Sequence, residues 1–191
     1  MQQSTERILT THVGSLPRSP AVVELLYKKE NGEAFDRAAF AATMASGVAD
    51  VVEKQLAAGV DIVSDGETSK VGYATYIKDR LSGFDGHYQR PPHRDLAPYP
   101  EFRAAMTRMI GPQSFKRAAC VGPIELTDRD AMRADVAHLS AAVAKQPVIE
   151  AFMNAASPGV VSAFQSNRYY PSHEDYIDAI VTAMKPEYDA I

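Results

Sequence analysis

The chain has 191 residues, of which 46% are hydrophobic and 23% are charged, and its formal net charge is −4. These values are typical of a globular domain, and the scattered Lys and Arg residues argue against a nucleic-acid-binding surface. No apolar run approaches the ~20 residues of a membrane-spanning helix, and the first residues lack a signal-peptide pattern. The single cysteine, Cys120, excludes an internal disulfide, so we expect a cytoplasmic protein without membrane or nucleic-acid partners.

Strand and helix patterns alternate along the chain. The first predicted strand is Ile8–Ser15, which is rich in β-branched residues and ends at a glycine. Apolar residues recur at helical spacing over 36–58 and predict an amphipathic helix, which a strand at 60–64 follows. The remaining predicted elements are a strand at 116–121, a helix from a capping box at Thr127–Asp130, a strand at 148–155, and a Ser172-capped helix that Pro186 is expected to kink.

Four strand–helix units in this order predict an α/β fold with a parallel sheet, and half of a (β/α)8 TIM barrel would have this content. We expect one domain over residues 1–191, with a long excursion at about 67–113 that contains short helices at 73–81 and 101–109. Four open parallel strands leave two uncovered edges. The chain is therefore either an open sandwich or an incomplete barrel of about four β/α units.

Two strand ends carry polar groups that suit a small ligand. Gly14 and Ser15 follow the first strand, and their amides and hydroxyl suit a carboxylate; the alternative is a plain tight turn. Glu67 follows the second strand and suits an ammonium group, although a loop glutamate is commonly solvated. Loops at the carboxyl ends of parallel strands converge on one crevice. The two groups would then hold the opposite ends of an α-amino acid.

Other polar residues give weaker signals. The cluster Tyr88–Arg94 combines arginines with aromatic rings, which suits a flat anionic ligand, but a solvated loop is the simpler interpretation. His12 faces either the interior near the ligand or a hydrogen-bonded core position. No metal-ligand spacing, Walker loop or nucleophile elbow occurs, so no metal ligand and no catalytic residue is assigned.

Several of these segments resemble the catalytic barrel of the cobalamin-independent methionine synthase family. Thr11–Arg18 is similar to its opening strand, which has the pattern Ile-Gly-Ser-Phe-Pro, and Asp61–Glu67 is similar to its second strand, which ends in Gly-Glu. Tyr88–Pro92 is similar to its basic loop followed by Pro-Pro. Val121–Pro123 and Ala155–Gly159 fall where strands three and four end. The closest likeness is to short, single-barrel, methionine synthase II-like relatives.

This resemblance implies zinc-dependent methyl transfer from 5-methyltetrahydrofolate polyglutamate to the thiol of homocysteine, which gives methionine. It implies that Val13, Gly14, Ser15 and Glu67 bind homocysteine, with His12 beside them, and that Gln89 and Arg90 bind the methyl donor. The zinc ligands of the family, a His, two Cys and a Glu, belong to the second half of the barrel, which we expect this chain to lack. A zinc-bound thiol becomes a thiolate at neutral pH, which explains the metal.

Two further departures from the family leave alternatives open. The family places a Trp at the folate, and this chain has none, so Tyr169 is assigned to the donor, with Phe164 and Tyr170 as alternatives. His12 stands where the synthase has Thr. The alternatives are alkyl transfer to another thiol such as coenzyme M, and a non-catalytic half-barrel that forms a homodimer through its exposed barrel edges.

Overall fold

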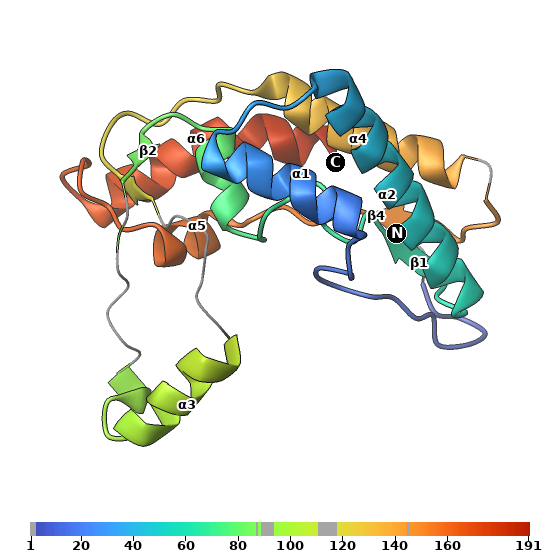
Figure 1. Cartoon of the computed structure of the whole chain (residues 1–191), viewed down its shortest axis with the longest axis horizontal. Coiled ribbons are helices and arrows are strands. Elements are labelled where there is room, and N and C mark those ends of the chain that lie inside the picture. The colour runs from blue at the N-terminus through green and yellow to red at the C-terminus, as the bar shows by residue number, and fades with distance from the viewer. Residues whose placement is uncertain (1–2, 87, 89–93, 111–117, 145) are drawn as a thin grey trace.

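A computed structural model describes residues 3–86, 88, 94–110, 118–144 and 146–191. Its helices and strands are arranged as an α/β fold (Figure 1). The elements are α1 (Pro20–Asn31), α2 (Arg37–Ala57), β1 (Ile62–Ser64), η1 (Thr75–Asp79), β2 (Phe84–Asp85), η2 (Arg94–Leu96), α3 (Pro100–Ile110), β3 (Ala119–Cys120), α4 (Arg129–Val143), β4 (Glu150–Phe152), α5 (Pro158–Phe164) and α6 (His173–Ala190), where η denotes a 3₁₀ helix.

Three chain segments form a parallel arrangement near the N-terminus. β1 and β4 pair in parallel, with Val63 opposite Ala151. Thr11 forms a parallel bridge to Ile62 on the other side of β1. Val63 is fully buried and packs with Val48 of α2 and Leu139 of α4, so these two helices cover one face of the sheet. The carboxyl ends of the three segments therefore point the same way, as a parallel sheet requires.

The predicted third strand does not belong to this sheet. Within the described residues, β3 pairs antiparallel with β2, with Phe84 opposite Cys120 and Asp85 opposite Ala119. β4, which we predicted as the fourth strand, lies directly beside β1. The expectation of four successive parallel strands is thus wrong at β3, while residues 116–117 of the predicted strand lie outside the described residues. The reason is that β2, inside the excursion, supplies an antiparallel partner that strand periodicity alone cannot reveal.

Helix ends follow capping chemistry closely. Ser172 is the N-cap of α6, as predicted, and Asp36 is the N-cap of α2; each side chain accepts from the backbone N–H three residues later. α4 is capped by Asp128, because the Thr127 hydroxyl instead donates to the Arg80 carbonyl. α6 continues through Pro186. The helix therefore does not restart there, and the kink expected at Pro186 stays a prediction.

Two of the described α-helices were not expected from the sequence. α1 begins after its N-cap Ser19, has Pro20 at its first position, and ends at Gly32, which has φ +71°. α5 begins in the same way, after Ser157 with Pro158. A hydroxyl residue followed by proline is a common helix start. These two Ser-Pro pairs therefore indicate the starts of α1 and α5 in the sequence itself. The expected short helices correspond to η1 and α3.

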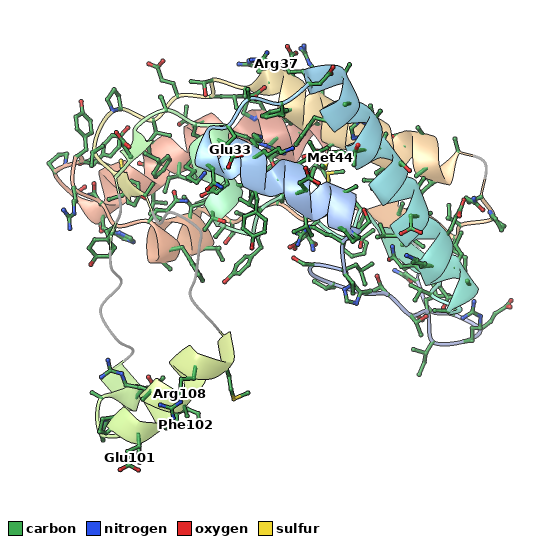
Figure 2. The ribbon with its side chains drawn as sticks, in the orientation of Figure 1. Glu33, Arg37, Met44, Glu101, Phe102 and Arg108 are labelled. Atoms are coloured by element: carbon green, nitrogen blue, oxygen red, sulfur yellow. The ribbon has the colours of Figure 1, made fainter. Side chains whose placement is uncertain are left out.

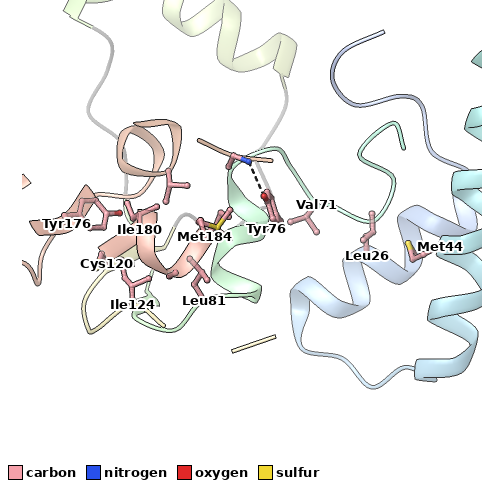
Figure 3. Packing of buried hydrophobic residues seen from close by; sticks show 14 of the residues in the cluster. Leu26, Met44, Val71, Tyr76, Leu81, Cys120, Ile124, Tyr176, Ile180 and Met184 are labelled. Carbon is pink, nitrogen blue, oxygen red and sulfur yellow. Dashed lines mark hydrogen bonds between the residues drawn. The ribbon is translucent and has the colours of Figure 1, made fainter. Parts of the chain in front are cut away.

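The larger core lies between α1, η1 and α6 (Figure 3). Leu26, Ile77, Ile180 and Met184 are at least 95% buried in it, together with the ring of Tyr76. α3 and the short η2 lie away from the other helices, and Figure 2 shows Glu101, Phe102 and Arg108 on α3. In the described part of the chain, no helix combines the length and apolar character needed to cross a membrane.

Candidate functional site

A cavity of about 400 Å³ lies at the carboxyl ends of the parallel segments. Parts of the chain that are distant in sequence contribute to it: the turn after Thr11, the loop after β1, and the loop after β4. Its lining residues are Val13, Gly14, Ser15, Glu67, Lys70, Tyr73, Asn154, Ala155, Ala156, Ser157 and Val160. This is the edge of a parallel sheet at which ligand sites usually form.

Ser15 and Glu67 meet in this cavity. The Ser15 hydroxyl donates a 2.6 Å hydrogen bond to Glu67 Oε2. Asn154 Nδ2 lies 3.3 Å from the other carboxylate oxygen, Oε1, and donates to it. Glu67 is only 4% exposed, so these contacts offset part of the cost of removing its charge from water. The carboxylate has lone pairs left for a further donor from the cavity.

The loop that carries Glu67 is held by Arg18. Its guanidinium donates to the carbonyls of Glu67, Thr68 and Lys70, at 2.9, 3.2 and 2.7 Å. Leu16 N–H also donates to the Gly66 carbonyl at 3.0 Å. The two strand-end loops are therefore joined by main-chain contacts. These contacts fix the Glu67 carboxylate in place before any ligand binds.

Glu67 is in the left-handed backbone region, with φ +54°, and it is the single described non-glycine residue with a positive φ. A side chain in this region costs about 1–2 kcal/mol. We expect Glu67→Gly to unfold with a free energy about 1 kcal/mol higher than Glu67→Ala, because only Ala keeps the strain. Glu53→Gly and Glu53→Ala, at an exposed position of α2, are the controls. There we expect the Ala variant to be the more stable by about 1 kcal/mol. Urea unfolding of the four variants tests this, and the same order at both positions would contradict it.

Burial and neighbouring charges compete in the electrostatics of this loop. Burial raises the pKa of Asp65, while the Lys70 charge and the Glu67 N–H, which donates to Asp65 Oδ1 at 3.1 Å, act to lower it. Burial lowers the pKa of Arg18, against the attraction of Glu67 and Asp65. The loop thus concentrates buried charges of both signs beside the cavity.

Lys70 and Asn154 belong to the site but were not expected from the sequence. Lys70 is 1% exposed, its Nζ donates to the Asn154 carbonyl, and it lies 5.1 Å from the centre of the Tyr76 ring. Asn154 comes two residues after β4, at the same sheet edge as Glu67, so the strand-end rule could have found it. No sequence signal marks Lys70, because most lysines are exposed.

The other candidate residues have different positions. Val13 and Gly14 line the cavity, and Gly14 has φ +100°, which favours glycine. His12 is half-buried, is absent from the cavity lining, and its Nε2 has no hydrogen-bond partner within the described residues. Tyr169 is 51% exposed, packs edge-on against Tyr170, and does not line the cavity. Gln89 and Arg90 lie outside the described residues.

The described residues do not form a zinc site. Over 3–86, 94–110, 118–144 and 146–191, no three His, Cys, Asp or Glu side chains are grouped so that they could hold a metal ion. Cys120 is buried, and burial raises the pKa of its thiol, which opposes thiolate formation. These residues do not fit the zinc that the resemblance implies, and no step through a metal is derived from them.

Residues 8–89 match the family model described as the catalytic domain of cobalamin-independent synthase. Over these residues, the match confirms the resemblance to the cobalamin-independent methionine synthase family. The matched segment contains both halves of the Ser15–Glu67 contact. Among curated proteins, none matches the chain significantly.

Solved methionine synthases share the fold. The B12-independent methionine synthase from Shewanella sp. W3-18-1, in complex with selenomethionine, has a TM-score of 0.61 and 18% identity, over 95% of this chain and 48% of that one. The putative vitamin-B12-independent methionine synthase from Listeria monocytogenes has a TM-score of 0.61 and 19% identity, over 96% of this chain and 50% of that one. The chain thus spans about half the length of these methionine synthases.

Proposed function

We propose that the chain forms the acceptor-binding part of a methyltransferase of this family, and that the acceptor is homocysteine. The proposal depends on one observation, the hydrogen-bonded pair of Ser15 and Glu67 in a cavity at the carboxyl edge of the sheet. Glu67 binds the ammonium group of homocysteine, because its carboxylate is buried, ionisable and oriented by two donors. Val13, Gly14 and Ser15 line the wall where the rest of the amino acid lies.

The Shewanella structure supports an amino-acid ligand. It is a complex with selenomethionine, which carries an ammonium and a carboxylate on one carbon, as homocysteine does. Coenzyme M, the alternative thiol, has a sulfonate and no ammonium, so it would leave the buried Glu67 carboxylate without a cation. The carboxylate therefore favours homocysteine over coenzyme M.

The methyl donor of the proposed reaction is 5-methyltetrahydrofolate. Gln89 and Arg90 remain the proposed contacts to its anionic groups, since a guanidinium binds carboxylates in a bidentate manner. Tyr169 remains a proposed donor contact: it is exposed, and its aromatic ring is free to accept a flat ligand on its outer face. It lies outside the cavity lining, so the donor would approach from the rim.

Glu67→Gln tests the acceptor site directly. The substitution keeps the shape of the side chain and removes its charge, so homocysteine should bind about tenfold or more weakly, which corresponds to about 1.4 kcal/mol. Isothermal titration of the chain with homocysteine measures this. Glu53→Gln, on the exposed face of α2, is the control and should leave the affinity unchanged. An equal affinity of both variants for homocysteine would remove Glu67 from the site.

A further inference from the structure

Lys70 has an unusual environment for a lysine. It is 1% exposed, yet it lines the same cavity as Glu67. Its Nζ donates to the Asn154 carbonyl and lies over the Tyr76 ring. Among the described residues, no carboxylate lies within ion-pair distance of Nζ, whereas the buried Arg80 has two. The Asp65 carboxylate attracts the Lys70 charge without forming an ion pair with it. Burying an ammonium without a carboxylate in contact is costly, so a lysine in this position needs another reason to be there.

Asn154 forms hydrogen bonds to two side chains of opposite charge, Lys70 and Glu67. The Asn154 carbonyl accepts from Lys70 Nζ, and its side-chain Nδ2 donates to Glu67 Oε1 at 3.3 Å. A cation and an anion thus line one cavity with a single asparagine between them. An α-amino acid carries its own ammonium and carboxylate on one carbon, so it offers a partner of opposite charge to each of the two side chains.

The Ser15 hydroxyl is not available to the carboxylate of such a ligand, which leaves the backbone N–H groups of Gly14 and Ser15 as neutral donors on that wall of the cavity. The hydroxyl proton is directed to Glu67 Oε2 at 2.6 Å, so the hydroxyl orients the acid and cannot donate to a second anion at the same time. Lys70 has three N–H donors, of which the Asn154 carbonyl accepts one. Donors are therefore left for an anion in the cavity, and the Lys70 charge makes such a hydrogen bond stronger.

We propose that Lys70 binds the carboxylate of the amino-acid ligand and so makes the site specific for zwitterions. This inference rests on the proposed function, because it assumes that the ligand ammonium lies at Glu67. Lys70 supplies the positive charge, Glu67 the negative charge, and Asn154 holds the two side chains apart. A ligand that lacks either charged group loses the corresponding partner and leaves a buried charge unpaired.

Three probes separate the two charges: homocysteine, aminopropanethiol, which lacks the carboxylate, and sulfanylbutanoate, which lacks the ammonium. Lys70→Gln removes the charge but keeps a donor for the Asn154 carbonyl. It should weaken homocysteine and sulfanylbutanoate about tenfold or more and leave aminopropanethiol within about twofold. Glu67→Gln should weaken homocysteine and aminopropanethiol instead. Lys54→Met, at an exposed lysine of α2, is the control and should change none of them.

NMR-detected titrations of the full 191-residue chain give the three affinities, and the ratio between probes is the readout. A fold defect would weaken all probes together, and Lys70→Met provides a second test with a side chain of similar length. The role of Lys70 is overturned if both Lys70 variants weaken the binding of all three probes equally. It is also overturned if neither variant weakens the binding of any probe. A wild-type chain that binds sulfanylbutanoate but not homocysteine contradicts the proposed function alone. A chain that binds none of the probes overturns both.

Discussion

Arg80→Met is expected to lower the free energy of unfolding by about 3–5 kcal/mol, the typical cost of removing one partner from a buried ion pair. Arg80 is 6% exposed and bonds to two acids from different helices. Its Nη2 donates to Asp135 Oδ2 of α4, and its Nη1 lies 3.0 Å from Glu187 Oε2 of α6. Burial opposes the Arg80 charge, but the attraction of the two acids outweighs this effect and raises its pKa.

The cost arises from the acids that remain, because both are buried. Asp135 also accepts from the Ser69 hydroxyl at 2.6 Å, and Glu187 Oε1 accepts from the Tyr76 hydroxyl at 2.8 Å. The Tyr76 hydroxyl in turn accepts from Ala156 N–H at 3.2 Å, in the wall of the cavity. Loss of the guanidinium would therefore disturb α4, α6 and the loop after β4 together.

Urea unfolding followed by circular dichroism measures the effect. The control is Arg133→Met, since Arg133 is 70% exposed and its pair with Asp130 is expected to contribute at most about 1 kcal/mol. A triple variant, Arg80→Met with Asp135→Asn and Glu187→Gln, removes all three charges and should recover part of the loss. If Arg80→Met is no more destabilising than Arg133→Met, the buried network is not important for stability.

The meeting of Ser15 and Glu67 was predictable because it follows from a general rule. Both residues come just after predicted parallel strands, and such strands end at one edge of the sheet. Thr11 bridges to Ile62, so the two strand ends are neighbours, and the hydrogen bond between the side chains is the consequence. The rule required only strand positions, which β-branched residues at 8–15 and 60–64 supplied.

Long-range partners explain what the sequence did not predict. β3 has two residues, and its antiparallel partner Phe84–Asp85 lies more than thirty positions earlier, in a stretch without strand periodicity. Lys70 is buried by residues that are close to it only in the fold: the Asn154 carbonyl accepts from its Nζ, and the Tyr76 ring packs against it. Neither feature has a local pattern. α1 was different, since the Ser19–Pro20 pair and Gly32 marked both of its ends.

Gly83→Ala is expected to lower the free energy of unfolding by about 3 kcal/mol. Gly83 precedes β2 and has φ +82°, where a Cβ costs about 1 kcal/mol or more. An added Cβ would also lie 2.6 Å from the Gly122 carbonyl oxygen and 2.7 Å from that of Pro123. Backbone atoms cannot move aside as a flexible side chain can, so the overlap adds about 2 kcal/mol.

Gly86→Ala is the matched control, because it separates the two contributions. Gly86 follows β2 and has a similar φ of +77°, but an added Cβ there meets no heavy atom within 4 Å. We expect it to cost about 1 kcal/mol, from the backbone conformation alone. Urea unfolding of both variants measures the difference. The Gly83 carbonyl accepts from Val121 N–H at 2.7 Å, so a shift at this position would pull apart β2 and β3. Equal losses in the two variants would mean that the close approach of Gly83 to 122–123 is not required, and that the β2–β3 pair tolerates a wider spacing.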